Sequence, residues 1–151
     1  MRTALLAYGF RPFFLASGIA ALLLLPWWVA IWLGAAAPVS AWPASLWHGH
    51  EMLFGFAAAA IAGFLLTAVP NWTGARGFAG MQLLRLVLLW LAGRAAIMLA
   101  GNLPAWLVGT LDALFLPALA AQIAVPIIRQ RNRNLPLLGV LGALALCNIV
   151  F

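Results

Sequence analysis

The segment Trp47–Met52, with the sequence WHGHEM, contains both histidines of the chain and one of its two acidic side chains. Imidazole nitrogens are good ligands for iron, copper and zinc, and an adjacent carboxylate can bind the metal or orient a histidine ring. Histidine is also a common axial ligand of haem, a flat group suited to apolar and aromatic surroundings. His48 and His50 are therefore candidate haem or metal ligands, and Glu51 is a further candidate metal ligand.

Helical spacing separates the two histidines. Side chains two residues apart on a helix point about 200° apart. His48 and Glu51 then lie near one stripe of the helix, whereas His50 lies on the other side with Phe54 and Ile61. The two rings can share one metal only if this turn is unwound. Otherwise one histidine holds a haem while the other bonds across the bundle, or the segment is an interfacial hydrogen-bonding cluster without metal.

The composition of the chain places these residues in a membrane. Hydrophobic residues make up 67% of the chain and charged residues 7%, whereas a soluble domain is about 25% charged. A helix that crosses the hydrocarbon core needs about 20 apolar residues, and four runs are long enough. We therefore expect an all-α fold, a polytopic transmembrane helix bundle with spanning helices at about 13–34, 47–69, 81–100 and 104–128.

A fifth apolar run, at about 136–151, ends with the chain. Its about 16 residues would measure roughly 24 Å as a helix, which is less than the roughly 30 Å of the hydrocarbon core. A truncated fifth helix would also leave the terminal carboxylate inside the bilayer, where charge is costly. We therefore expect residues 1–151 to form a single membrane-embedded unit that is the N-terminal part of a longer protein.

The arginines alternate between the expected connections. Basic residues precede the first helix and lie around the connections after the second and fourth: Arg2, Arg11, Arg76, Arg85, Arg129, Arg131 and Arg133. The connections at about 35–46 and 101–103 carry no charge. This positive-inside pattern predicts a cytoplasmic N-terminus and places WHGHEM at the outer face. It also explains the net charge of +6 without a nucleic-acid partner.

Two charged residues lie within the expected third and fourth helices. Arg94 and Asp112 are each about eight residues from the turn that joins these helices, so they reach the same depth in one hairpin. Charged groups inside a membrane are almost always paired or functional. We expect Arg94 and Asp112 to form a structural ion pair that holds the hairpin together, with a proton or ligand pathway as the alternative.

Small residues recur every fourth position along the second expected helix. Gly55, Ala59 and Gly63 share one stripe. Small side chains at this spacing let another helix approach closely. The stripe is therefore a predicted helix-packing face.

Four tracts of the chain resemble the NnrS family. They are GFRPFF at 9–14, WHGHEMLFGF at 47–56, GFLLTAVPNWTG at 63–74 and RNLPLL at 133–138, and they follow the family's order over essentially the whole chain. The resemblance implies a multi-pass protein of the bacterial inner membrane that contains haem and copper and is associated with denitrification and nitric-oxide stress. Family members are longer, with about twelve spanning helices, so this chain resembles their N-terminal part.

The family's histidine motif falls on His48 and His50, with Glu51 beside them. The resemblance implies that both histidines bind haem or copper, without saying which binds which. It implies that Glu51 orients a ligand or accepts a proton, and that further ligands come from other helices of a longer protein or from a homo-oligomer. The resemblance implies no settled reaction, so it leaves open whether the protein is an enzyme.

Three functions remain open on the sequence. The first is a haem and copper membrane protein that protects against, or responds to, nitric oxide. The second is a transporter or channel segment in which Glu51, Arg94 and Asp112 line a polar path. The third is an assembly subunit whose small-residue face, from Gly55 to Gly63, docks a partner. The histidine segment and the resemblance favour the first. In all three cases the protein lies in the lipid bilayer.

Overall fold

The computed structural model describes residues 4–38 and 40–151, so Arg2 lies outside the described part of the chain. That part is all-α, with one isolated bridge between Ala100 and Leu103. In chain order its helices are the 3₁₀ helix η1 (Ala4–Leu6), α1 (Phe10–Trp32), α2 (Ala44–His50), the π-helix η2 (Glu51–Ala57), α3 (Ala58–Thr73), α4 (Met81–Met98), α5 (Ala105–Ala113), α6 (Phe115–Arg129) and α7 (Pro136–Val150).

Four long apolar helical segments confirm the predicted fold class. Helices α1 and α4 are two of them, α2, η2 and α3 run on as a third, and α5 with α6 makes the fourth. Each is long and apolar enough to cross a membrane. Helix α7 is shorter, at 15 residues. The largest difference from the expected bounds is at the end of the second span, expected near residue 69 and observed at Thr73.

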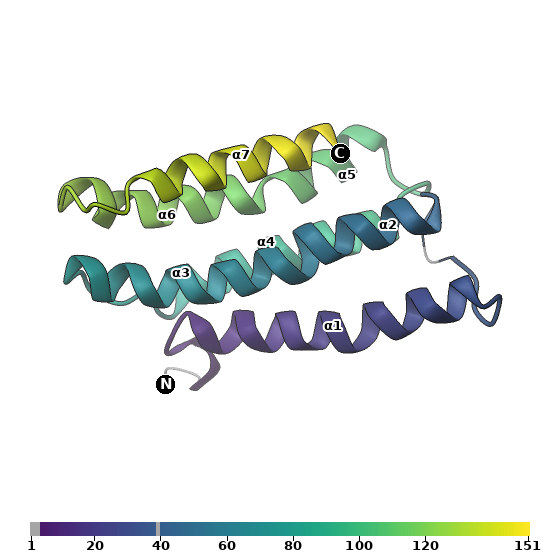
Figure 1. Cartoon of the computed structure of the whole chain (residues 1–151), viewed down its shortest axis with the longest axis horizontal. Coiled ribbons are helices and arrows are strands. Elements are labelled where there is room, and N and C mark those ends of the chain that lie inside the picture. The colour runs from purple at the N-terminus through teal and green to yellow at the C-terminus, as the bar shows by residue number, and fades with distance from the viewer. Residues whose placement is uncertain (1–3, 39) are drawn as a thin grey trace.

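The segment formed by α2, η2 and α3 lies in the middle of the bundle. Figure 1 shows it between α1 on one side and α6 with α7 on the other, with α4 behind it, and α3 packs against both α1 and α6. Half of its most apolar stretch is buried, compared with 17% for α1. A central helix is covered on several faces, so side chains on opposite sides of it can both reach the protein interior.

The arginines outside the helix interiors gather at one end of the bundle. This end holds the start of α1, the connection from α3 to α4 and the connection from α6 to α7, together with Arg11, Arg76, Arg129, Arg131 and Arg133. The opposite end holds the connections from α1 to α2 and from α4 to α5, which carry no charged residue. We call these two ends the basic end and the uncharged end.

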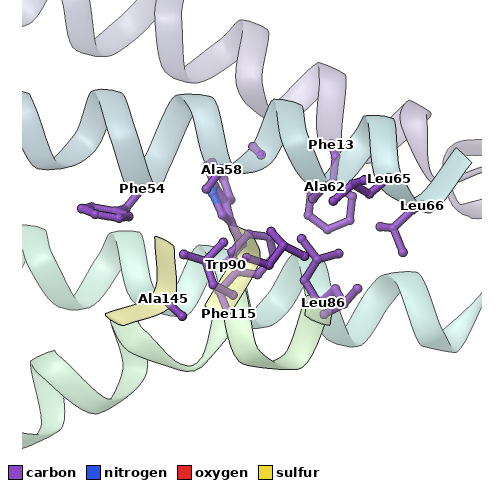
Figure 2. Packing of buried hydrophobic residues seen from close by; sticks show 14 of the residues in the cluster. Phe13, Phe54, Ala58, Ala62, Leu65, Leu66, Leu86, Trp90, Phe115 and Ala145 are labelled. Atoms are coloured by element: carbon purple, nitrogen blue, oxygen red, sulfur yellow. The ribbon is translucent and has the colours of Figure 1, made fainter. Parts of the chain in front are cut away.

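Buried apolar side chains from several helices fill the centre of the bundle. Figure 2 shows Phe13 of α1, Leu65 of α3, Trp90 of α4 and Phe115 of α6 pointing toward one another, with Ala145 of α7 nearby. All of these side chains are buried. The contact between α1 and α6 through Phe13 and Phe115, with ring centroids 5.8 Å apart, brings helices distant in sequence into one core.

The predicted stripe of small residues packs inside this chain. Ala59 is fully buried. A methyl group added to Gly63 would lie 2.8 Å from Cδ1 of Phe14 and 3.3 Å from Cβ of Phe13, so α1 rests directly on the backbone of α3 at this point. Because α1 covers this part of the stripe, Gly63 is not available as a docking face for another protein.

Substitutions of a crowded glycine and of an open glycine should have opposite effects on stability. Gly63→Ala adds a methyl group where Phe14 already lies, and overpacking of this kind costs about 1 kcal/mol or more. Gly18→Ala, on α1, meets no atom within 4 Å and should stabilise the helix by about 0.5–1 kcal/mol. Melting temperatures in detergent should fall for the first variant and rise slightly for the second. Equal melting temperatures would contradict the packing of α1 on Gly63.

Candidate functional site

Five buried polar side chains meet between the central helix and its neighbours. We call Glu51, Arg94, Asp112, His50 and Asn148 the polar cluster; all five are buried. Arg94 donates from Nη1 to Oε1 of Glu51 over 2.9 Å and from Nη2 to Oδ1 of Asp112. One guanidinium therefore joins two carboxylates from different helices.

His50 extends the cluster to α7. Its Nε2 lies 3.0 Å from Oδ2 of Asp112 and 3.1 Å from Oδ1 of Asn148. Both of these neighbours are oxygen atoms, so Nε2 carries the proton and donates to them. The side chains of five helical segments are thereby connected: α2 through His50, η2 through Glu51, α4 through Arg94, α5 through Asp112 and α7 through Asn148.

Local backbone structure makes room for this cluster. The π-helix η2 begins at Glu51, and π-helical turns are often found at functional sites. Two of its carbonyl groups accept side-chain hydrogen bonds, that of Gly55 from Nε1 of Trp90 over 3.1 Å and that of Phe56 from Oγ of Ser17 over 3.2 Å. These bonds to α4 and α1 satisfy backbone groups in the widened turn.

Two glycines let charged groups approach the helices closely. A methyl group at Gly55 would lie 2.7 Å from Oε2 of Glu51 and 3.3 Å from Nη1 of Arg94. A methyl group at Gly93 would lie 3.1 Å from Cα of Asp112. The missing side chains therefore bring α4 and α5 together and allow Arg94 to lie between its two carboxylates.

The two histidines lie in different surroundings. The ring of His48 stacks on Trp28 of α1, with centroids 4.2 Å apart and an angle of 14° between the planes. The Nδ1 atoms of both histidines are buried and have no hydrogen-bond partner among the described residues. His50, by contrast, is 1% exposed and contacts α5 and α7. Helical spacing correctly separates the two rings, but it groups Glu51 with His48, whereas the structure joins Glu51 to the cluster that contains His50.

A pocket lies beside His50 at the uncharged end. Its volume is about 430 Å³, and its walls come from the connections at this end and from α5 and α7. Three members of the polar cluster line it, His50, Asp112 and Asn148, together with apolar and aromatic side chains. Glu51 and Arg94 do not line it. The cluster therefore has one face toward a pocket and one face buried in protein.

The comparison with protein families found one match. The family described as NnrS protein matches residues 4–151 of this chain. The chain belongs to the NnrS family. No curated protein and no solved structure matched it. With its four long apolar helical segments, it is a multi-pass membrane protein of the NnrS family.

Membership of the NnrS family raises the question of haem and copper. Within residues 4–38 and 40–151, no three His, Cys, Asp or Glu side chains are grouped so that they could hold a metal ion. Nor do His48 and His50 fit one shared metal, because their rings contact different helices. Copper sites are built from several nitrogen or sulfur ligands, so these residues of the NnrS chain do not form a copper site by themselves.

Axial ligation of haem needs only one histidine, and His48 fits this requirement. Stacking on Trp28 covers a face of the ring, while metal ligation uses a nitrogen lone pair in the ring plane. Nδ1 of each ring lacks a hydrogen-bond partner among the described residues. The His50 ring is 1% exposed, and its Nε2 proton is held by Asp112 and Asn148, whereas the His48 ring is only partly buried. Of the two candidate ligands in this NnrS chain, His48 is thus the one less enclosed by protein.

Asn148 is the member of the polar cluster that the sequence analysis missed. The signal was present, because Asn148 is the one strongly polar side chain in the apolar run from Pro136 to Phe151. The contact between Glu51 and Arg94 was also missed. A single arginine inside the membrane together with two acidic residues in the whole chain is itself a reason to expect all three charges to meet.

Proposed function

We propose that this chain belongs to a haem-binding protein of the bacterial inner membrane that responds to nitric oxide. Its family membership supports the cofactor and the biological setting. The observation that carries the assignment to residues is the difference between the histidines: His50 is 1% exposed and its Nε2 is held by Asp112 and Asn148, whereas His48 is only partly buried and its ring stacks on Trp28. A bound haem would supply an iron atom at which nitric oxide can bind, and His48 would hold that iron from this chain.

The other residues position this ligand. Trp28 sets the orientation of the His48 ring by stacking on it. The polar cluster fixes the helix that carries His48 against α4, α5 and α7. In this proposal Glu51 anchors Arg94 rather than binding metal, because its Oε1 accepts from Arg94, while its Oε2 lies beside Gly55 without a hydrogen-bond partner among the described residues. A copper ion, if bound, takes its further ligands from other helices of a longer protein or from a second copy.

The distribution of arginine supports an orientation. The basic end faces the cytoplasm by the positive-inside rule, which places the N-terminus inside and the uncharged end outside. His48, His50 and the pocket then lie in the outer half of the membrane. A ligand from the periplasm or from the bilayer can reach this region without crossing the whole membrane.

Absorption spectra of histidine variants test the haem assignment. Detergent-purified protein from the intact reading frame is compared with His48→Ala and His50→Ala, each oxidised and then reduced with dithionite. We expect the parent to show a haem Soret band, and His48→Ala to lose most of it. His50→Ala should keep its haem but melt at a lower temperature, because Asp112 and Asn148 lose their partner.

The reverse pattern would overturn the assignment. Haem lost in His50→Ala at an unchanged melting temperature, with full haem in His48→Ala, would make His50 the ligand. A folded parent that carries no haem when produced in cells with ample haem would refute the proposed function itself.

The transport alternative has less support from the geometry. A polar path would need Glu51, Arg94 and Asp112 to line a continuous opening. Only Asp112 of these three lines the pocket, and Arg94 closes directly onto both carboxylates. Proton flux in liposomes that depends on Glu51 would revive this alternative.

A further inference from the structure

The pocket beside His50 lies apart from the residues assigned to haem. His48 contacts α1 through Trp28, whereas the pocket lies toward α5 and α7 and does not include His48 among its lining residues. A volume of about 430 Å³ falls within the range of about 300–1,000 Å³ typical of small-molecule sites. The pocket is therefore a candidate site separate from the proposed haem ligand.

One part of the pocket offers both a hydrogen-bond donor and an acceptor. The amide nitrogen of Asn148 has one long contact, 3.4 Å to the carbonyl of Asp112, so at least one of its two hydrogens is available. Oδ2 of Asp112 accepts from His50 and retains a lone-pair direction. A ligand oxygen that accepts a hydrogen bond, donates one, or does both can bind at this point.

The remaining walls are apolar and aromatic. Trp42 and Phe151 lie against the His50 ring, at centroid distances of 5.3 and 5.5 Å, and both line the pocket. Aromatic side chains in this arrangement suit a flat ring. Among the residues that the structure describes, no arginine or lysine lines the pocket, and Asp112 is already paired with Arg94. An anionic ligand such as a phospholipid phosphate has no counter-charge here.

One wall of the pocket is formed by an exposed apolar side chain of α7. Ile149 of α7 lines the pocket and is 63% exposed, and it lies within an apolar helix of a membrane protein. An apolar ligand can therefore enter from the lipid. We propose that this pocket binds the ring of a membrane-soluble quinone or quinol, with a ring oxygen at Asp112 and Asn148 and the apolar tail leaving past Ile149. The inference goes beyond the proposed haem function and does not depend on it.

Gly109 provides a variant that fills the pocket without straining the fold. It lines the pocket, and a methyl group there meets no atom within 4 Å. Gly139 on α7 is equally open but does not line the pocket. Gly109→Leu and Gly139→Leu therefore make the same chemical change, but only Gly109→Leu places a side chain in the pocket. Asn148→Ala removes the donor and leaves the walls in place.

The test is a titration of the detergent-purified protein with decylubiquinone, followed by tryptophan fluorescence, with decylbenzene as a probe that lacks ring oxygens. We expect saturable binding of decylubiquinone to the parent and to Gly139→Leu, no measurable binding to Gly109→Leu, and little binding of decylbenzene. Asn148→Ala should bind about tenfold more weakly, as for the loss of one hydrogen bond.

Three results would overturn the inference. The first is a parent that does not bind decylubiquinone, and the second is equal binding by Gly109→Leu and Gly139→Leu at matching melting temperatures. The third is the loss of haem together with quinone in Gly109→Leu, which would make the pocket part of the haem site. If Gly109→Leu fails to fold, unchanged affinity in Asn148→Ala refutes the proposed contact. Haem spectra of His48→Ala are measured separately, so failure of the haem proposal and failure of the quinone proposal are distinguishable.

Discussion

Arg94→Met is expected to lower the free energy of unfolding by about 3–5 kcal/mol, the usual cost of removing one partner from a buried ion pair. Arg94 is the cation between Glu51 and Asp112, and all three side chains are buried. Methionine fills a similar volume but leaves two carboxylates close together without a counter-charge. The melting temperature in detergent should fall by about 6–20 °C, given about 2–4 °C for each kcal/mol in a chain of this size.

A matched control lies on the same helix. Arg85 is also on α4 but is exposed and near the basic end, so Arg85→Met should change stability by no more than about 0.5 kcal/mol. A second substitution probes the mechanism. Adding Glu51→Gln to Arg94→Met should recover part of the lost stability, because it removes one of the two unpaired charges. Equal melting temperatures for Arg94→Met and Arg85→Met would show that the polar cluster does not stabilise the bundle.

The position of the polar cluster explains why an apolar bundle keeps these groups. Apolar contacts between helices give little directional preference in lipid, because lipid tails are as apolar as leucine. The cluster instead provides directional contacts from the central helix to α4, α5 and α7 at one level. These contacts define how the helices are placed around the segment that carries both histidines.

The spans and their approximate ends were predictable from the sequence because each depends on local composition. A run of apolar residues must satisfy its backbone hydrogen bonds internally in lipid, and a helix is the simple solution. The contact between Arg94 and Asp112 was also predictable, because one tight turn places both residues at the same depth. In each case the information lies within one helix or one hairpin.

The lateral arrangement of the helices could not be read in the same way. Glu51 meets Arg94 across 43 positions of sequence and His50 meets Asn148 across 98, and no local turn relates these pairs. The widened turn of η2 was not predicted, because it also depends on residues distant in sequence. Its carbonyl groups accept hydrogen bonds from Ser17 and Trp90 of other helices. Helical spacing alone separates Glu51 from His50, whereas the neighbours of a central helix bring both into one cluster.

Asp112→Asn is the second substitution with a large expected effect. Asp112 accepts from Arg94 at one oxygen and from His50 at the other. Asparagine keeps the shape but removes the charge, and it can offer an oxygen to only one of these donors. Since a hydrogen bond to a charged group contributes about 1.5–3 kcal/mol, we expect a loss of about 2–4 kcal/mol, measured as a lower melting temperature in detergent. Haem content per folded protein should stay at the parent level.

Glu51→Gln is a control that leaves both contacts of Asp112 in place. It weakens the bond from Arg94 to Glu51 but leaves His50, Asp112 and Asn148 joined, so it should cost less stability than Asp112→Asn. If Asp112→Asn instead keeps its melting temperature and loses haem, Asp112 acts on the cofactor and not on the packing of helices. His50, which Asp112 orients, would then be the haem ligand. The proposal that His48 binds the iron would be wrong. Stability and haem content measured on the same samples therefore decide whether the polar cluster builds the bundle or the site.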